Sequence, residues 1–456
     1  MTPALEALKS HLNGRLIDPD HPQWDEARLA WNLSVDQQPA AVALPESADD
    51  VVAVVRTARE HGLRVAPQGT GHGAGAMGSL DDAVLLKPHR MSGVDIDADN
   101  ARARVQAGAI WRDLTPPAAE HGLAALSGSA GDVGIVGYSI GGGLGWTLRK
   151  HGLSCNAIAR AEVVTADGKL VTASPDSEPD LFWAIRGGGG SFGAVTSLEI
   201  ELVPVTELYA GVLYWPQERA PEILPAWRDW TADLPEEMTS IGRLLNVPPF
   251  PGIPEPIRGR SFVVVEAAFL GDEAAGTEVL KPLRDLGPEM DTFATIPPPG
   301  LSHLHNDPPE PVPGAGDGVL LDECTDAALE HLCEVAGAGS GTPLLSVEIR
   351  HVGGAAGRPD PQGGALDHIP AKFAVYAVGI AATPEMKAGV NAAIAQMKEA
   401  FAEGMSRHTY MNFCERGTDT ARMFTPEAYA RLREIKRAYD PQDVFQANHS
   451  IPPADE

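Results

Sequence analysis

His72 lies in a glycine-rich loop, residues 69–78, and is the first candidate for chemistry in this 456-residue chain. The G-x-G-x-x-A pattern of residues 71–76 formally matches a loose dinucleotide fingerprint. That fingerprint must open a helix whose N-terminus receives a pyrophosphate, whereas here the apolar run 83–87 predicts another strand. We therefore expect no Rossmann-type nicotinamide site. The loop instead offers consecutive backbone N–H groups that can bind an anion around the imidazole.

A second glycine-rich segment, residues 128–145, holds eight glycines in eighteen positions. Such a density destabilises an ordinary helix or strand, so we expect something to approach the backbone closely there. Residues 137–141 also match G-x-S-x-G, the nucleophile elbow of hydrolases, with Ser139 as the nucleophile. The helix that should follow would begin with three glycines, and no oxyanion segment of the H-G-G-G type lies upstream. A serine hydrolase therefore remains as the alternative of a different class.

Metal-binding patterns are weak in this chain. His303 and His305, followed by Asp307, lie in the proline-rich stretch 297–313, without further ligands at compatible positions. We expect them to be polar residues of a loop that runs over the surface or a cleft, and we expect no metal. The four cysteines are scattered and form no C-x-x-C motif, so zinc and dithiol sites are excluded by spacing.

Glu348 and Arg350 lie in the predicted strand 344–351. Because side chains alternate along a strand, these two share a face. The pattern fits an ion pair at the edge of a cleft and fits a catalytic role equally well.

The elements that must position these residues change in character after residue 204. Before it, short strands and helices alternate around the glycine loops, with a helix over 48–61 that begins at a capping box formed by Ser47 and Asp50. After it, long strands alternate with amphipathic helices, which predicts an α+β second domain. The expected elements are strands 63–66, 83–87, 102–109, 194–203, 209–214, 261–269, 344–351 and 373–381, a hairpin over 161–173, and helices 111–121, 180–186, 219–232, 272–286, 325–336, 384–402 and 426–438.

The charge balance restricts the partners. Because 35 Lys and Arg face 62 Asp and Glu, the formal net charge is −27, which disfavours nucleic acid and membrane surfaces. No apolar run approaches the roughly 18 residues of a membrane span, and residues 1–13 lack a secretory signal. We expect a cytoplasmic protein that acts on a small molecule, and the oligomeric state stays open.

Several segments, taken in order, resemble the berberine bridge enzyme-like branch of the vanillyl-alcohol oxidase flavoproteins, which have a PCMH-type FAD-binding domain. The resemblance covers nearly the whole chain and implies an α+β fold. It implies an FAD-binding domain built from residues 1–205 and 405–456, and a central substrate-binding domain, 206–404, with an antiparallel sheet covered by helices. The segments are 67–73, 128–145, 186–196, Tyr410-x-Asn412-Phe413 and 439–453.

The resemblance also implies how FAD is held. In this family the histidine of the first glycine loop is bonded to the flavin, so we expect His72 to form a covalent link. Where many members have a second linking cysteine this chain has Ala130, so we expect a single link and no cysteinyl bond. The other residues expected to bind the cofactor are Gln68, Gly69, Thr70, Gly71, Gly73, Gly78, Gly128, Ser129, Val133, Gly134, Gly137, Tyr138, Gly142, Gly143, Val195, Asn412 and Asn448.

The implied reaction is hydride transfer from a substrate C–H bond to FAD, assisted by a base. Tyr410 matches the family tyrosine that serves or assists as base, and Arg350 or Glu348 would tune it. Val133 occupies a position associated with oxygen access, which favours an oxidase that forms hydrogen peroxide from an alcohol, sugar or secondary-metabolite donor. A dehydrogenase or an oxygenating enzyme of the same fold remains the alternative.

Overall fold

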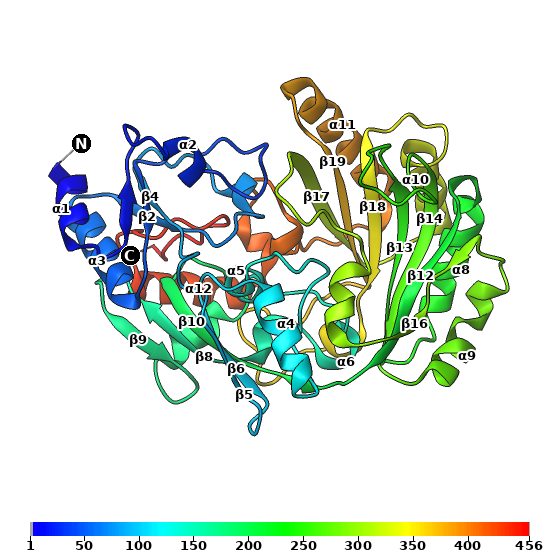
Figure 1. The fold of residues 1–456 in the computed structure, drawn as a ribbon, viewed down its shortest axis with the longest axis horizontal. Coiled ribbons are helices and arrows are strands. Elements are labelled where there is room, and N and C mark those ends of the chain that lie inside the picture. The colour runs from blue at the N-terminus through cyan, green and yellow to red at the C-terminus, as the bar shows by residue number, and fades with distance from the viewer. Residues whose placement is uncertain (1–2, 456) are drawn as a thin grey trace.

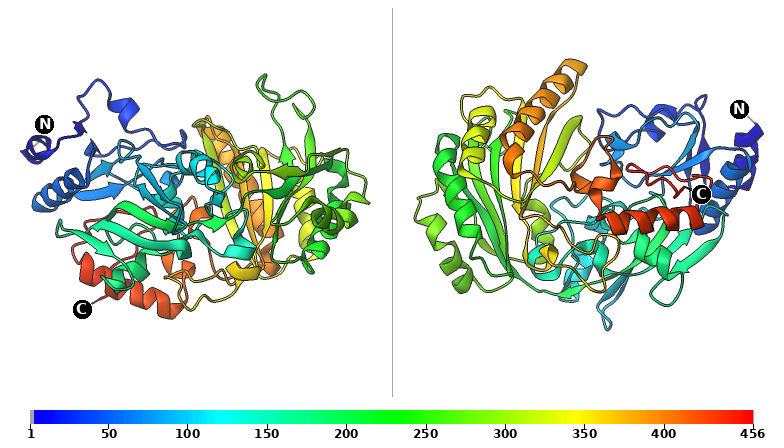
Figure 2. Two further views of the ribbon diagram at one scale, coloured as in Figure 1. Left: turned by 60° about the horizontal axis from the view of Figure 1, so that its bottom comes forward. Right: turned by 180° about the vertical axis from the view of Figure 1, so that it is seen from behind.

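The computed structural model describes residues 3–455, which form two parts lying side by side (Figure 1). The N-terminal segments and the last helix make up one part, and the middle of the chain makes up the other. Both chain ends lie in the first part, far from the large sheet of the second (Figure 2). The α+β fold class is therefore confirmed. No helix among residues 3–455 is both long and apolar enough to cross a membrane.

The sheets of the first part combine parallel and antiparallel strands. One has the order β1-β2-β4-β3, in which β4 is parallel to both β2 and β3. Another, β5-β6-β10-β8-β9, is antiparallel throughout, and β11 pairs with β7. The strands are β1 (Arg15–Ile17), β2 (Ala41–Leu44), β3 (Arg64–Pro67), β4 (Ala83–Leu86), β5 (Val94–Asp97), β6 (Arg102–Gln106), β7 (Leu123–Ala124), β8 (Ile158–Val164), β9 (Leu170–Ala173), β10 (Ala194–Glu201) and β11 (Val203–Pro204).

The four helices that the sequence predicts in this part are confirmed, one of them with a different cap, and four further helices, α1, α2, α5 and α6, were not predicted. Ser47 accepts a hydrogen bond from the N–H of Asp50, as expected. The Asp50 carboxylate, however, accepts from the N–H groups of Asn13 and Glu46, so the predicted capping box is wrong and Asp50 instead fixes the N-terminal segment. The helices are α1 (Pro3–His11), α2 (Trp24–Ala27), α3 (Ala48–Glu60), α4 (Trp111–Glu120), α5 (Ile135–Ile140), α6 (Leu148–His151), α7 (Pro179–Ile185) and α12 (Pro426–Tyr439).

The middle of the chain forms one antiparallel sheet of eight strands. Its order is β15-β12-β14-β13-β18-β19-β17, and β16 pairs with β12. The antiparallel sheet covered by helices that the sequence predicts is confirmed. The elements are β12 (Leu208–Pro216), α8 (Ala220–Thr231), β13 (Met238–Asn246), β14 (Ser261–Phe269), α9 (Glu273–Arg284), β15 (Met290–Asp291), β16 (Ala294–Ile296), β17 (Gly314–Leu321), α10 (Asp326–Ala336), β18 (Leu344–His351), β19 (Phe373–Ile380) and α11 (Pro384–Ala400).

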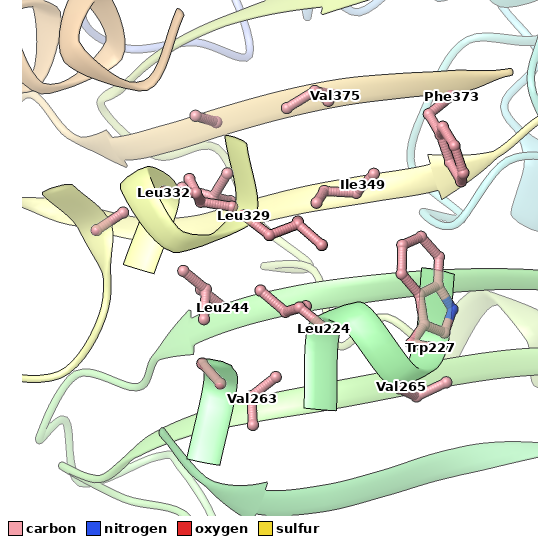
Figure 3. Close-up of a cluster of buried hydrophobic side chains, with 14 of the residues drawn as sticks. Leu224, Trp227, Leu244, Val263, Val265, Leu329, Leu332, Ile349, Phe373 and Val375 are labelled. Atoms are coloured by element: carbon pink, nitrogen blue, oxygen red, sulfur yellow. The ribbon is translucent and has the colours of Figure 1, made fainter. Parts of the chain in front are cut away.

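Helices α8, α10 and α11 cover one face of this sheet and bury its largest apolar cluster. Figure 3 shows Trp227 of α8 and Leu329 of α10 against strand residues such as Ile349. Full burial of a side chain of this size stabilises a fold by roughly 1.5–3 kcal/mol. Because the helices cover this face of the sheet, polar residues of the sheet such as Glu348 lie on its opposite face.

The segment that follows α11 returns to the first part. The N–H of Val65 in β3 donates to the carbonyl of Val444, and the N–H of Gln446 donates to the carbonyl of Val65. Buried Arg149, in α6, donates to the carbonyls of Leu234, Pro235, Met238 and Val352 and so ties the two parts together.

Candidate active site

The loop after β3 is fixed by hydrogen bonds between two buried glutamine side chains. Gln37 and Gln68 exchange two hydrogen bonds of 2.8 and 3.0 Å. Gly71 has φ +90°, and a Cβ there would lie 3.0 Å from Ala30 and from the Gln68 amide, so the turn requires glycine. The strand β4 follows without an intervening α-helix, which excludes the Rossmann reading as expected.

His72 presents one ring nitrogen without a partner. The ring stacks on Trp31 at 4.2 Å, and Nδ1 lies 2.7 Å from the hydroxyl of Thr70. Nε2 is buried without a hydrogen-bond partner and lies 4.0 Å from Asp132, whose carboxylate accepts from the Trp31 indole at 2.6 Å. Burial lowers the pKa of His72 to about 4, so the imidazole is neutral at pH 7. A neutral imidazole with a free nitrogen is a competent nucleophile.

The glycine density of segment 128–145 predicted no ordinary helix or strand there. That prediction is wrong for residues 135–140, which form helix α5. The glycines after it face side chains. A Cβ at Gly141 would lie 2.1 Å from the Asn412 amide, one at Gly142 would lie 2.8 Å from Tyr410, and one at Gly143 would lie 2.6 Å from Tyr138. Close approach of the backbone is therefore explained by the Tyr410 segment, while contact with a cofactor at these glycines stays a prediction.

Tyr410 is buried and its hydroxyl is held by two donors. The oxygen accepts from the N–H of Gly143 at 2.8 Å and from the Asn412 amide at 3.3 Å. Asn412 also donates to the carbonyl of Tyr138. Burial raises the pKa of Tyr410 above its usual value of 10, while the two donors and the charge of Arg350 act in the opposite direction. Burial therefore keeps the phenol protonated at neutral pH, and the two donors and Arg350 offset only part of the cost of ionising it.

Glu348 and Arg350 form a salt bridge, but not at an exposed edge. The Nε and Nη2 atoms of Arg350 lie 2.8 and 3.1 Å from the two Glu348 oxygens, and both side chains are buried. The Arg350 guanidinium stacks 5.3 Å from the Phe413 ring, which in turn contacts Tyr410 edge to face at 5.3 Å. The pair and Tyr410 are therefore brought together around Phe413.

The expectation that His305 is an ordinary polar loop residue is wrong, because it is buried in an ion-pair network. Its side chain is 6% exposed and lies between the carboxylates of Glu266 and Glu348. Asp307, two residues on, accepts from the Ser129 hydroxyl at 2.7 Å, while His303 is exposed. The stretch 297–313 therefore packs inward because long-range ion pairs, which sequence spacing does not reveal, compensate its charges.

The remaining predicted residues lie around the His72 loop and α5. A Cβ at Gly73 would be 3.0 Å from the Asn448 amide, and Gly134 faces Thr70. Tyr138 has a buried hydroxyl without a hydrogen-bond partner. Val133 and Val195 are partly buried, Gly128 faces Tyr138, and a Cβ at Gly69, Gly78 or Gly137 would meet open space.

Sequence reasoning missed three groups at this site. Trp31 and Asp132 flank His72, and Gln446 donates to the carbonyls of Met77 and Ser79 at the end of the loop. The Gln446 carbonyl oxygen is buried without a partner. Gln446 and Asp132 fall inside segments already recognised, whereas Trp31 carries no local signal. The unpartnered Nε2 of His72, hydroxyl of Tyr138 and carbonyl of Gln446 fit a polar cofactor bound across them.

Ser139 does not stand on a nucleophile elbow. It lies inside α5, is fully buried, and its hydroxyl bonds to that of Ser154 at 3.0 Å. A hydrolase nucleophile must be exposed at a strand-to-helix turn. The geometry therefore disfavours the hydrolase alternative.

His72 with its unpartnered Nε2, and the buried Tyr410 bonded to Gly143 of the second glycine-rich segment, fit a flavoprotein oxidoreductase. Residues 39–174 match the FAD binding domain family, and residues 409–452 match the family described as berberine and berberine like. These matches, together with relatives named as FAD-linked oxidoreductases and oxidases, identify the chain as an FAD-dependent oxidoreductase that resembles the berberine bridge enzyme-like flavoproteins.

Named relatives agree with this assignment. The chain is 28% identical to (R)-6-hydroxynicotine oxidase of Paenarthrobacter nicotinovorans over 97% of each sequence, and 27% identical to chitooligosaccharide oxidase of Gibberella zeae over 98% of this chain and 95% of that one. The solved structure of 6-hydroxy-D-nicotine oxidase from Arthrobacter nicotinovorans superposes with a TM-score of 0.84 at 25% identity, covering 97% of this chain and 98% of that chain.

Proposed function

We propose that the protein is an oxidase with FAD bound through a single covalent link to His72. Residues 1–205 and 405–456 form its FAD-binding domain, and residues 206–404 form its substrate-binding domain. The observation that carries the proposal is the neutral His72 imidazole, whose Nε2 atom is buried without a hydrogen-bond partner. A second link is absent from the proposal because Ala130 takes the cysteine position, and Cys155 is buried with its thiol directed at the Leu366 carbonyl.

FAD, when bound, accepts a hydride from the donor C–H bond and passes the electrons to molecular oxygen, giving hydrogen peroxide. The chain's own part is to position the donor and to move one proton. The Tyr410 oxygen takes the proton of the donor's O–H or N–H group. The N–H of Gly143 and the Asn412 amide stabilise the phenolate form of Tyr410 that must exist before this transfer, and the transferred proton then neutralises it.

The donor class is an alcohol, sugar or secondary-metabolite hydroxyl. Support comes from relatives named as oxidases of chitooligosaccharide and of glucooligosaccharide. Polar side chains gathered on one side of Tyr410, among them Glu348 and Arg350, suit a hydroxylated donor better than an apolar one. Val133 supports oxygen as the acceptor, with a dehydrogenase or an oxygenating enzyme as the second candidate.

The linkage is tested by acid precipitation of the purified protein. The flavin absorbance should stay with the pellet of the wild type and of His61→Ala, since His61 is an exposed histidine of the same domain. It should move to the supernatant for His72→Ala. Flavin that remains attached to His72→Ala would refute the linkage, and a colourless wild-type protein would refute the proposed function.

The donor is found by mixing the yellow protein with candidate donors without oxygen. Bleaching of the flavin identifies a donor, and readmission of air then measures peroxide. Bleaching that air does not reverse would show a dehydrogenase rather than an oxidase.

A further inference from the structure

Five charged side chains form a buried row on the sheet of the middle segment. Arg243 lies on β13, Glu266 on β14, Glu348 and Arg350 on β18, and His305 reaches in from the loop after β16. Arg243, Glu266, His305 and Glu348 are buried, and the side chain of Arg350 is 11% exposed. Burial of so many charges requires close pairing.

The pairing alternates along the row. Arg243 lies 2.9 Å from Glu266, His305 Nδ1 contacts the second oxygen of Glu266, His305 Nε2 lies 2.8 Å from Glu348, and Glu348 pairs with Arg350. Arg243 also donates to the carbonyl of His305 and to the hydroxyl of Ser346, so the loop is fixed to the strands.

The geometry sets the charge of His305. An ionised carboxylate only accepts hydrogen bonds, and each of the two carboxylates forms an ion pair with its own arginine, Glu266 with Arg243 and Glu348 with Arg350. Both ring nitrogens of His305 must therefore carry a proton, which makes the ring an imidazolium. The ionised carboxylates raise the pKa of His305 to about 9, against the opposing effects of burial and Arg243.

The row ends at the candidate active site. Arg350 stacks on Phe413 beside Tyr410, and Asp307, 3.9 Å from His305 Nε2, accepts from Ser129 in the glycine-rich segment. Glu348 directs the guanidinium of Arg350, and His305 holds the Glu348 carboxylate from the other side. Loss of His305 would leave Glu348 free to rotate with Arg350.

We propose that His305 is a positioning residue for the reaction: its imidazolium bridges Glu266 and Glu348 and so holds Arg350 against the Tyr410 side of the active site. His305 touches neither Tyr410 nor the His72 loop and acts through Glu348. The inference rests on the proposed function, because Tyr410 must act on the donor for the position of Arg350 to matter.

The charge state is tested on the wild-type holoenzyme by nitrogen-15 NMR of labelled histidines. The pKa of His305 is raised to about 9. One imidazole should therefore stay doubly protonated at pH 7.5 and titrate near pH 9. The charged groups that face it are Arg243 of β13, Glu266 of β14, Glu348 and Arg350 of β18 and Asp307 of its own loop, with Tyr214 of β12 beside Glu266. The absence of such a resonance would overturn the inference whether or not the protein is an oxidase.

The positioning role is tested by anaerobic flavin reduction in His305→Gln, with His303→Gln as the matched control on the same loop. Gln keeps one donor but loses the charge. The limiting reduction rate of His305→Gln should fall by about tenfold or more, and the donor concentration for half-saturation should change less. The inflection in the pH profile near pH 9 that deprotonation of His305 causes in the wild type should be absent from the variant. His303→Gln should reduce like the wild type. A His305→Gln protein with the wild-type rate and pH profile would refute the role, and an unreactive wild type would instead refute the proposed function.

Discussion

Replacement of Tyr410 by Phe removes one oxygen atom, and it should affect both the rate of flavin reduction and the free energy of unfolding. A general base contributes about 100- to 10,000-fold to a rate, so we expect flavin reduction to slow by a factor in that range. The N–H of Gly143 also loses its acceptor, whereas the Asn412 amide keeps the carbonyl of Tyr138. One unsatisfied buried donor costs about 1–3 kcal/mol of unfolding free energy.

The matched control is Tyr376→Phe. Tyr376 packs on the same Phe413 ring, at 5.2 Å against 5.3 Å for Tyr410, and its hydroxyl bonds to Glu415 instead. Both variants should lose similar stability, but only Tyr410→Phe should lose the rate.

The assay is anaerobic stopped-flow at the flavin absorbance, with donor affinity taken from the concentration dependence. Because burial raises the pKa of Tyr410, the wild-type rate should rise with pH through the alkaline range as the phenolate fraction grows, and the variant should lack this rise. A Tyr410→Phe protein that reduces its flavin within about threefold of the wild-type rate would show that the base lies elsewhere.

Three further outcomes are expected. Val133→Leu should slow reoxidation of the reduced enzyme by oxygen, by about tenfold, equivalent to about 1.4 kcal/mol, and an unchanged rate removes the basis for preferring an oxidase. Arg149→Met should lower the unfolding free energy by about 3 kcal/mol, because four carbonyls lose a charged donor; urea denaturation checks it, with exposed Arg160→Met as the control. The wild type should lose stability as pH rises. His305 has a pKa of about 9 when folded and 6.5 when unfolded, so its contribution is complete below pH 6.5 and is lost through pH 9, roughly 3 kcal/mol in all. The same pH series on His305→Gln should be flatter, and equal slopes would contradict the assignment.

Periodic segments were predictable because their burial is one-sided. The predicted strand 261–269 coincides with β14, and the predicted helix 384–402 is close to α11, Pro384–Ala400. The strands β13 and β17 were missed. β13 is central and mostly buried, so it shows no alternation, and β17 contains glycines, with Gly316 facing the Tyr376 hydroxyl and Gly318 facing Phe413.

Some residues of the candidate site could be predicted from the sequence and others could not. His72 and Tyr410 lie in segments whose composition is unusual, so the sequence identified them. His305 was misjudged because its partners, Glu266 and Glu348, lie 39 and 43 residues away along the chain, and only the sheet brings them together. A buried ionic residue is defined by its partners and not by its neighbours in sequence.

The packing of Tyr410 and Asn412 against residues 141–143 has a consequence for how the enzyme matures. His72 leaves the ribosome about 20 to 70 seconds before Tyr410, at synthesis rates of roughly 5–20 residues per second. Until the final segment arrives, Gly141 and Gly142 lack the side chains that cover them, and β3 lacks its partner at Val444. The proposed flavin site is therefore completed only after nearly the whole chain has been made. The proposed attachment of FAD to His72 would then be a late event in biosynthesis, and a chain that stops before residue 410 would be released without a finished site.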